Sequence, residues 1–277
     1  MTQIIGIAGK IGSGKTTLCR YLHGYFMKNL IPNPVDPDTR GIIHSYMINE
    51  LGQLLVPATS EDENSDEDSF GIFDPESRDE VVRDFLSSVV WPYIKSYSFA
   101  GYLKQICIDM YGATEEQLYG TQEQKATPVA GLLWENMVGS VESKTRTKKE
   151  LDLISEAKLV EKTGPMTSRE LMQYLGTDIL RRANPRCHAD ACLKNIKRDD
   201  PAFAVICDLR FSDTEVPAVR DNGGLTIYLT RDEFKNSHTS EESIGPADCD
   251  EVIDNENMTI EESCNAFIDI LKKRSIL

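Results

Sequence analysis

Residues 3–17 read QIIGIAGKIGSGKTT, an apolar run followed at once by a glycine-rich turn. The run from Gln3 to Ala8 predicts a short buried strand. A helical pattern then extends from about Lys15 to Lys28, with apolar and aromatic residues on one face. A strand, a glycine turn and a helix in this order are typical of the start of a parallel α/β sheet.

The turn from Gly9 to Thr16 matches the pattern Gly-x-x-x-x-Gly-Lys-Thr in full. Glycines let successive backbone N–H groups point at phosphate oxygens, and the start of the next helix adds partial positive charge. We expect Lys15 to bridge the β- and γ-phosphates of ATP, Thr16 to ligate Mg²⁺ and Thr17 to donate to the α-phosphate. The residues predicted to hold the donor nucleotide here are Gly12, Ser13, Gly14, Lys15, Thr16 and Thr17.

Beyond the loop, apolar runs of strand length alternate with helical patterns. Further strands are predicted at 95–99, 203–207, 225–229 and 251–253. Helices are predicted at 41–55, 77–90, 102–110, 167–182, 188–198, 214–221 and 259–273, the stretch 129–162 being helical or irregular, and capping boxes at 114–117, 167–170 and 259–262. About five strands interleaved with helices indicate the α/β P-loop NTPase fold, a parallel sheet flanked by helices, with a helical substrate-binding or lid part.

The domain organisation is predicted as a single P-loop domain over 1–277. Residues 31–93 form an expected insertion, which includes the acidic run EDENSDED at 61–68, a solvated loop. Residues 112–200 form an expected, mostly helical substrate-binding region.

Composition narrows the classes of function. The 277 residues carry a formal net charge of −15, which disfavours nucleic-acid and anionic-membrane partners because phosphate contacts need a positive face. Seven scattered cysteines without a Cys-x-x-Cys pair favour a reducing compartment. With no signal peptide or membrane-spanning run in the sequence, we expect a cytoplasmic protein, in the host cytoplasm if a phage encodes it; a homodimer stays open.

The strand at 204–207 is followed by Asp208-Leu209-Arg210. Asp208 offers a carboxylate for a metal or substrate, but the adjacent glutamate that would activate water is missing, and no Asn-Lys-x-Asp guanine motif is present. Phosphate transfer to a bound acceptor fits better than hydrolysis. Arg210 follows a buried strand directly and is the preferred cation for the transferring phosphate; the other candidate cations are Lys104, Lys125, Arg169, Arg181, Arg182, Arg186 and Arg231.

Several segments together resemble the bacteriophage deoxynucleoside monophosphate kinases. They are the P-loop, SFAGYLK at 98–104, EQLYGTQEQK at 116–125, RELMQYLGTD at 169–178, DLRF at 208–211 with Glu215, HTSE at 238–241 and DEVIDN at 250–255. They keep one order across roughly two-thirds of the chain, so the resemblance is more specific than the P-loop alone.

The resemblance implies transfer of the ATP γ-phosphate to a deoxynucleoside monophosphate (dNMP), with Mg²⁺ as cofactor. Lys15, Asp208 and Arg210 would be catalytic, Thr16 and Asp208 would hold the metal, and Arg231 would lie on the ATP side. The residues implied for the acceptor nucleotide are Lys104, Lys125, Arg169, Gln173, Gly176, Thr177 and Asp178, with Gln173 as a reader of the base edge. A mobile segment from Arg181 to Arg186 would close over the site.

The segment 31–93 has no counterpart in the resemblance, and Glu170 stands where a basic residue is sometimes expected. The acceptor therefore stays open among dTMP, dGMP and a modified dCMP. Two other functions also stay open: a different P-loop small-molecule kinase, such as dephospho-coenzyme A kinase, and a nucleotide-binding regulator without turnover.

Overall fold

The computed structural model describes residues 2–31, 45–57, 70–137, 162–232 and 243–277. The chain divides into two compact units, Met1–Phe99 with Ala189–Leu277 (unit 1) and Ala100–His188 (unit 2). The predicted acidic run at 61–68 and the HTSE segment at 238–241 lie outside the described residues.

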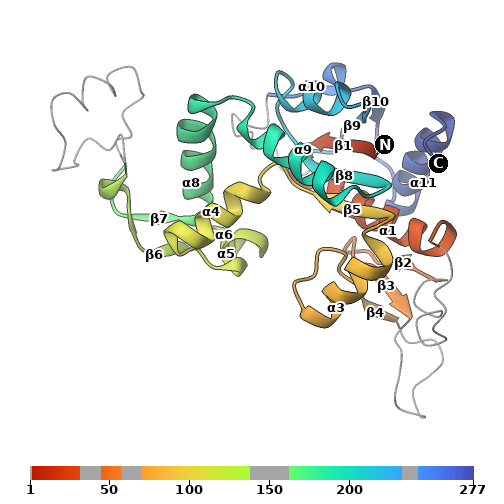
Figure 1. Ribbon diagram of the computed structural model, residues 1–277, viewed down its shortest axis with the longest axis horizontal. Coiled ribbons are helices and arrows are strands. Elements are labelled where there is room, and N and C mark those ends of the chain that lie inside the picture. Colours follow the sequence, from red (N-terminus) through yellow and green to blue (C-terminus); the bar gives the residue numbers. More distant parts are fainter. Residues whose placement is uncertain (1, 32–44, 58–69, 138–161, 233–242) are drawn as a thin grey trace, which may run out of the picture. The chain divides into compact units, whose positions relative to one another are not determined.

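Unit 1 is built on a five-stranded parallel sheet with the order β10-β9-β1-β8-β5 (Figure 1). Its strands are β1 (Gln3–Gly9), β5 (Ile94–Tyr97), β8 (Phe203–Leu209), β9 (Leu225–Leu229) and β10 (Glu251–Ile253). Its helices are α1 (Lys15–Asn29), α3 (Glu80–Phe85) with the π-helix η1 (Leu86–Val90), α9 (Cys187–Asp199), α10 (Glu215–Arg220), the 3₁₀ turn η4 (Pro246–Asp248) and α11 (Ile260–Lys273). The predicted α/β fold class and strand count are confirmed.

The sheet is buried on both faces because β1 alternates its side chains between two apolar clusters. Ile5 and Ile7 pack with residues of α1 and α11 on one face. Ile4 and Ala8 pack with residues of α9 and α10 on the other. This arrangement places β1 at the centre of the sheet, and its carboxyl end opens between β8 and β9, where ligands bind in sheets of this type.

The described part of the segment predicted as a helix at 41–55 forms strands instead. Its described part forms β2 (Met47–Ile48) and the start of β3 (Leu54–Pro57), which join β4 (Phe70–Ile72) in a three-stranded antiparallel sheet. The spacing of Met47, Leu51 and Leu54 imitates a helix, but Gly52 has a φ of +71°, which ends any helical run and turns the chain. The helix prediction is therefore wrong here.

Unit 2 has its own core, in which Trp134 packs edge-on against Tyr174. Its elements are α4 (Gly101–Tyr111), α5 (Glu115–Tyr119), α6 (Gln122–Lys125), β6 (Pro128–Leu133), the 3₁₀ turn η2 (Trp134–Asn136), β7 (Pro165–Thr167), α8 (Ser168–Gln173) and the π-helix η3 (Tyr174–Arg181). The stretch from 129 was predicted as helical or irregular, but residues 128–133 pair with β7 as an antiparallel ribbon. The capping boxes at Thr114, Thr167 and Thr259 are confirmed.

Candidate active site

The loop between β1 and α1 is closed by its glycines. Gly9, Gly12 and Gly14 have φ values of +142°, +81° and +97°, which side chains of other residues rarely adopt. A Cβ on Gly9 would lie 2.7 Å from the Ser13 hydroxyl oxygen and 2.8 Å from the Leu229 carbonyl oxygen. Only glycine fits there, and the N-terminus of α1 faces the turn.

Lys15, the first residue of α1, returns its ammonium group to this loop. Its Nζ donates to the carbonyl oxygens of Gly9 (2.7 Å) and Lys10 (2.6 Å), and lies 3.4 Å from the Ser13 hydroxyl. A fixed positive charge therefore stands inside a ring of backbone groups. This is an arrangement suited to the phosphates of a nucleotide.

Asn255, just after β10, anchors the loop. Its Nδ2 donates to the Ser13 carbonyl oxygen (2.9 Å), and its Oδ1 accepts from the Arg231 backbone N–H (2.9 Å). Ser13 and Asn255 are fully buried. Asn255 lies in a segment that carries the family resemblance, but no local pattern indicates a role for it, because its contact with Ser13 spans 242 residues.

Asp208 lies at the carboxyl end of β8, next to the strand that carries the loop. The pairing of β1 with β8 shifts between Gly6–Ile206 and Ala8–Leu209, so β8 contains one extra residue there. The Asp208 carboxylate accepts from the Ser98 hydroxyl (2.6 Å) and the Phe99 N–H (2.9 Å). These bonds fix the carboxylate at the sheet edge where the loop begins.

Arg210 follows on an exposed turn. The turn is shaped by Glu215, a buried carboxylate that accepts from the backbone N–H groups of Arg210 (2.7 Å) and Phe211 (3.2 Å). Glu215 is among the residues that carry the resemblance, which implies no role for it. The structure shows that it orients the backbone that presents the Arg210 side chain.

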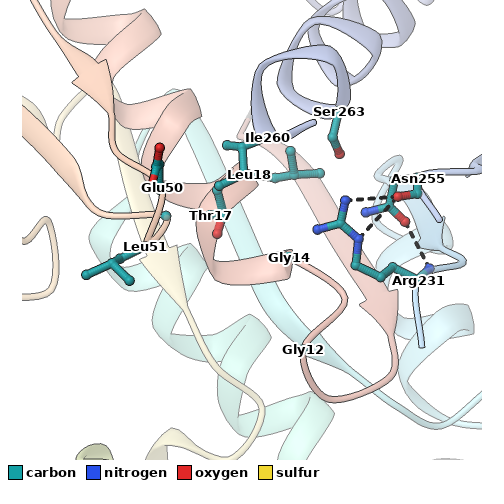
Figure 2. Close-up of a pocket in the computed structure, with 11 residues that line it drawn as sticks. Gly12, Gly14, Thr17, Leu18, Glu50, Leu51, Arg231, Asn255, Ile260 and Ser263 are labelled. Carbon is teal, nitrogen blue, oxygen red and sulfur yellow. Dashed lines mark hydrogen bonds between the residues drawn. The ribbon is translucent and has the colours of Figure 1, made fainter. Parts of the chain in front are cut away.

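A cavity of about 260 Å³ opens beside the loop (Figure 2). Four residues predicted to hold the donor nucleotide lie in its wall: Gly12, Gly14, Thr17 and Arg231. The Arg231 guanidinium donates to the carbonyl oxygens of Asn255 (3.0 and 3.2 Å) and Met258 (2.5 Å). The full lining is Gly12, Gly14, Thr17, Leu18, Glu50, Leu51, Gly52, Arg231, Asn255, Ile260 and Ser263.

The predicted acceptor residues all belong to unit 2. The Lys104 ammonium lies 4.1 Å from the centre of the Tyr119 ring, a cation–π contact. Arg169 donates to the Gln122 side chain on α6. The Ser168 hydroxyl donates to the carbonyl oxygens of Gln117 and Lys125, so the start of α8 is tied to α5 and α6.

The remaining predicted acceptor residues lie where α8 passes into η3. Gln173 is half-buried, Gly176 is buried, and Thr177 and Asp178 are exposed. A Cβ on Gly176 would lie 2.6 Å from the Leu103 side chain, so this glycine permits close packing of η3 on α4. Arg181 ends η3 and Arg186 precedes α9; neither position tests the predicted closure.

The two predicted metal ligands, Thr16 and Asp208, both carry oxygen donors. Oxygen ligands such as the Thr16 hydroxyl and the Asp208 carboxylate are of the kind that Mg²⁺ uses beside substrate phosphates, so the donor set suits this ion.

No group of three or more His, Cys, Asp or Glu side chains gathers in the described ranges, and the seven cysteines, all within them, are free. Among these residues, no helical stretch has the combined length and apolar character that a bilayer crossing demands.

Comparisons with known proteins identify the family to which this chain is similar. Residues 101–265 match the model of a family described as deoxynucleotide monophosphate kinase. A protein of Acanthamoeba polyphaga mimivirus, described as "Putative deoxynucleotide monophosphate kinase", is 26% identical over 192 residues, which cover 64% of this chain and 83% of that protein. The family match begins after the glycine loop, so the loop geometry and the match are separate observations.

Proposed function

The chain belongs to the deoxynucleotide monophosphate kinase family, and we propose that it moves the γ-phosphate of ATP to the 5′-phosphate of a dNMP. The single observation that supports the binding of ATP is the glycine-rich loop closed around the Lys15 ammonium. Of the functions that the sequence left open, the family favours this one over dephospho-coenzyme A kinase and over a regulator without turnover.

The donor triphosphate lies on the loop. Backbone N–H groups of the loop and the start of α1 bind its oxygens, and Lys15 neutralises the β,γ-bridge. Thr17 donates to the α-phosphate, and the nucleoside occupies the cavity that Thr17 and Arg231 line. Leu18 and Ile260 give that cavity apolar walls, which suit a flat base.

Thr16 and Asp208 would hold Mg²⁺ beside the phosphates. The ion would neutralise charge that develops on the β- and γ-phosphate oxygens during transfer. The hydrogen bonds from Ser98 and Phe99 keep the Asp208 carboxylate oriented for this contact.

In the transfer step an oxygen of the acceptor 5′-phosphate attacks the γ-phosphorus in line, and the bond from that phosphorus to the β,γ-bridging oxygen breaks. The products are dNDP and ADP. The acceptor oxygen is already ionised at neutral pH, so no general base is required. Arg210 stabilises the equatorial oxygens, because a guanidinium binds phosphate oxygens in pairs.

The acceptor nucleotide is assigned to unit 2. Lys104, Lys125 and Arg169 supply cations for its phosphate, and Gln173 reads its base edge, since an amide both donates and accepts. Gly176, Thr177 and Asp178 complete the pocket. Because the donor is ATP and the acceptor a nucleotide, we assign the protein to the cytoplasm.

Release of ADP in the presence of each common dNMP tests this proposal, with Lys15→Ala compared with Lys28→Ala, an exposed lysine near the other end of α1. We expect dNMP-dependent ADP release by the wild type and by Lys28→Ala, and a loss of about 100-fold or more in Lys15→Ala. ADP release that no dNMP increases would refute the transfer. Equal rates in the two variants would refute the role of Lys15.

A further inference from the structure

The cavity beside the phosphate loop has one wall from outside the P-loop core, which is the five-stranded sheet with its flanking helices. Glu50, Leu51 and Gly52 form the tip of the β2–β3 hairpin, within the segment 31–93 that was predicted as an insertion. In Figure 2, Glu50 and Leu51 stand on one side of the cavity, and Arg231 and Asn255 stand on the opposite side. The hairpin and the P-loop core therefore enclose the same space.

The hairpin is packed directly on α1. A Cβ on Gly52 would lie 2.2 Å from the Thr17 hydroxyl oxygen, so the hairpin tip touches the second residue after Lys15. Two turns further along α1, a Cβ on Gly24 would lie 2.3 Å from the Tyr46 ring. Arg20 also donates to the Gly52 carbonyl oxygen (3.4 Å). At both contacts, a glycine on one element leaves room for a side chain of the other.

The tip itself is held in one conformation by Asn49. Its Oδ1 accepts from the N–H groups of Leu51 (3.0 Å) and Gln53 (2.9 Å), and its Nδ2 donates to the Gln53 side chain (2.9 Å). Gly52 takes the left-handed conformation that completes the turn. Glu50 is thus presented from a preformed turn, and its carboxylate has no hydrogen-bond or salt-bridge partner among the residues that the structure describes.

We propose that the hairpin tip is the donor-specificity element of this enzyme, and that the Glu50 carboxylate accepts hydrogen bonds from the sugar hydroxyls of the donor nucleotide. This inference rests on the proposed function. A carboxylate is repelled by the triphosphate, so Glu50 faces the uncharged nucleoside end of the donor. Vicinal sugar hydroxyls are the donors that a carboxylate commonly binds at nucleotide sites. The hairpin thereby acts on the choice of donor.

A donor panel tests the role of Glu50. KM is measured for ATP, 2′-deoxy-ATP and 3′-deoxy-ATP with the wild type, Glu50→Ala and Glu80→Ala, an exposed glutamate on α3 that does not line the cavity. We expect the wild type and Glu80→Ala to bind at least one deoxy donor about fivefold more weakly than ATP. In Glu50→Ala, KM for ATP rises by about the same factor and the difference among donors disappears. An unchanged donor ratio in Glu50→Ala overturns the proposal.

A glycine pair tests the position of the hairpin. Gly52 and Gly223 have nearly equal φ values, +71° and +74°, but an added Cβ meets Thr17 only at Gly52; at Gly223 it meets nothing within 4 Å. We expect Gly52→Ala to raise KM for ATP and leave KM for the dNMP unchanged. Gly223→Ala bears the same backbone strain and keeps the wild-type KM for ATP. Equal KM values for ATP in the two variants overturn the proposal.

Different results would refute the proposed function and the role of the hairpin. Wild-type enzyme that transfers phosphate from no donor to any dNMP refutes the proposed function. If the wild-type enzyme transfers phosphate, but Glu50→Ala leaves the donor ratio unchanged or Gly52→Ala has the same KM for ATP as Gly223→Ala, only the role of the hairpin is refuted.

Discussion

Replacement of Asn255 by alanine is expected to loosen the phosphate loop, although Asn255 is not one of the residues proposed to contact phosphate. The Asn255 side chain is 1% exposed and makes two hydrogen bonds of 2.9 Å, one to the Ser13 carbonyl oxygen and one from the Arg231 N–H. Asn255→Ala leaves the buried Ser13 carbonyl oxygen and the partly buried Arg231 N–H without these partners. Each buried unsatisfied group costs about 1–3 kcal/mol, so the free energy of unfolding should fall by about 3 kcal/mol.

For a chain of this size that loss corresponds to a decrease of roughly 6–12 °C in the unfolding midpoint. The same change lets the loop backbone move, so MgATP affinity should fall by about tenfold. Thermal unfolding followed by circular dichroism and calorimetric titration with MgATP measure the two effects. Asn222→Ala is the matched control, because the Asn222 side chain donates to the local Ala218 carbonyl oxygen (2.9 Å) and does not reach the phosphate loop.

The reasoning would be refuted if Asn255→Ala melts at the same temperature as Asn222→Ala and binds MgATP as tightly. A lower midpoint with unchanged MgATP affinity would show that Asn255 stabilises the fold but does not position the loop.

Three further outcomes are expected. Arg210→Ala should lower kcat about 100-fold with KM for ATP nearly unchanged, whereas Arg83→Ala, an exposed arginine on α3, should match the wild type in steady-state kinetics. Burial raises the pKa of Asp250, but hydrogen bonds from Thr226 and Arg220 outweigh this effect and hold the pKa below its usual value. The ionised Asp250 therefore stabilises the fold above about pH 4, and this stabilisation is lost as the pH falls through the lowered pKa. Denaturant unfolding should show a gap between wild type and Asp250→Asn at pH 7 that narrows in acid; a gap independent of pH contradicts the assignment. Gly176→Ala should destabilise unit 2 by about 1–3 kcal/mol because its Cβ would lie 2.6 Å from Leu103, whereas Gly71→Ala, with nothing within 4 Å, should show no such loss in urea unfolding.

Local patterns in the sequence predicted the elements whose signals are local. The strands at 225–229 and 251–253 have the predicted bounds, and β1 and α1 lie within one residue of theirs. The capping boxes at Thr114, Thr167 and Thr259 depend on residues three apart and are present as expected. The glycine loop was recognisable because its motif and both flanking elements are contiguous.

What the sequence could not predict depends on contacts between distant residues. The β2–β3 hairpin was mistaken for a helix because its apolar spacing fits both structures, and its packing on Gly24 decides between them. Asn255 and Glu215 act on backbone groups through buried side chains, and no pattern marks such contacts in advance. The acceptor residues remain a prediction from resemblance, located on α4, α6, α8 and η3.

The fate of a radiolabelled γ-phosphate distinguishes transfer to a dNMP from hydrolysis and from binding without turnover. The wild-type protein is incubated with Mg²⁺, γ-labelled ATP and each common dNMP, and the products are separated by thin-layer chromatography. We expect label in the β-position of at least one dNDP, and none there with Lys15→Ala. Label that stays in ATP, or appears only as inorganic phosphate with every dNMP, would contradict it.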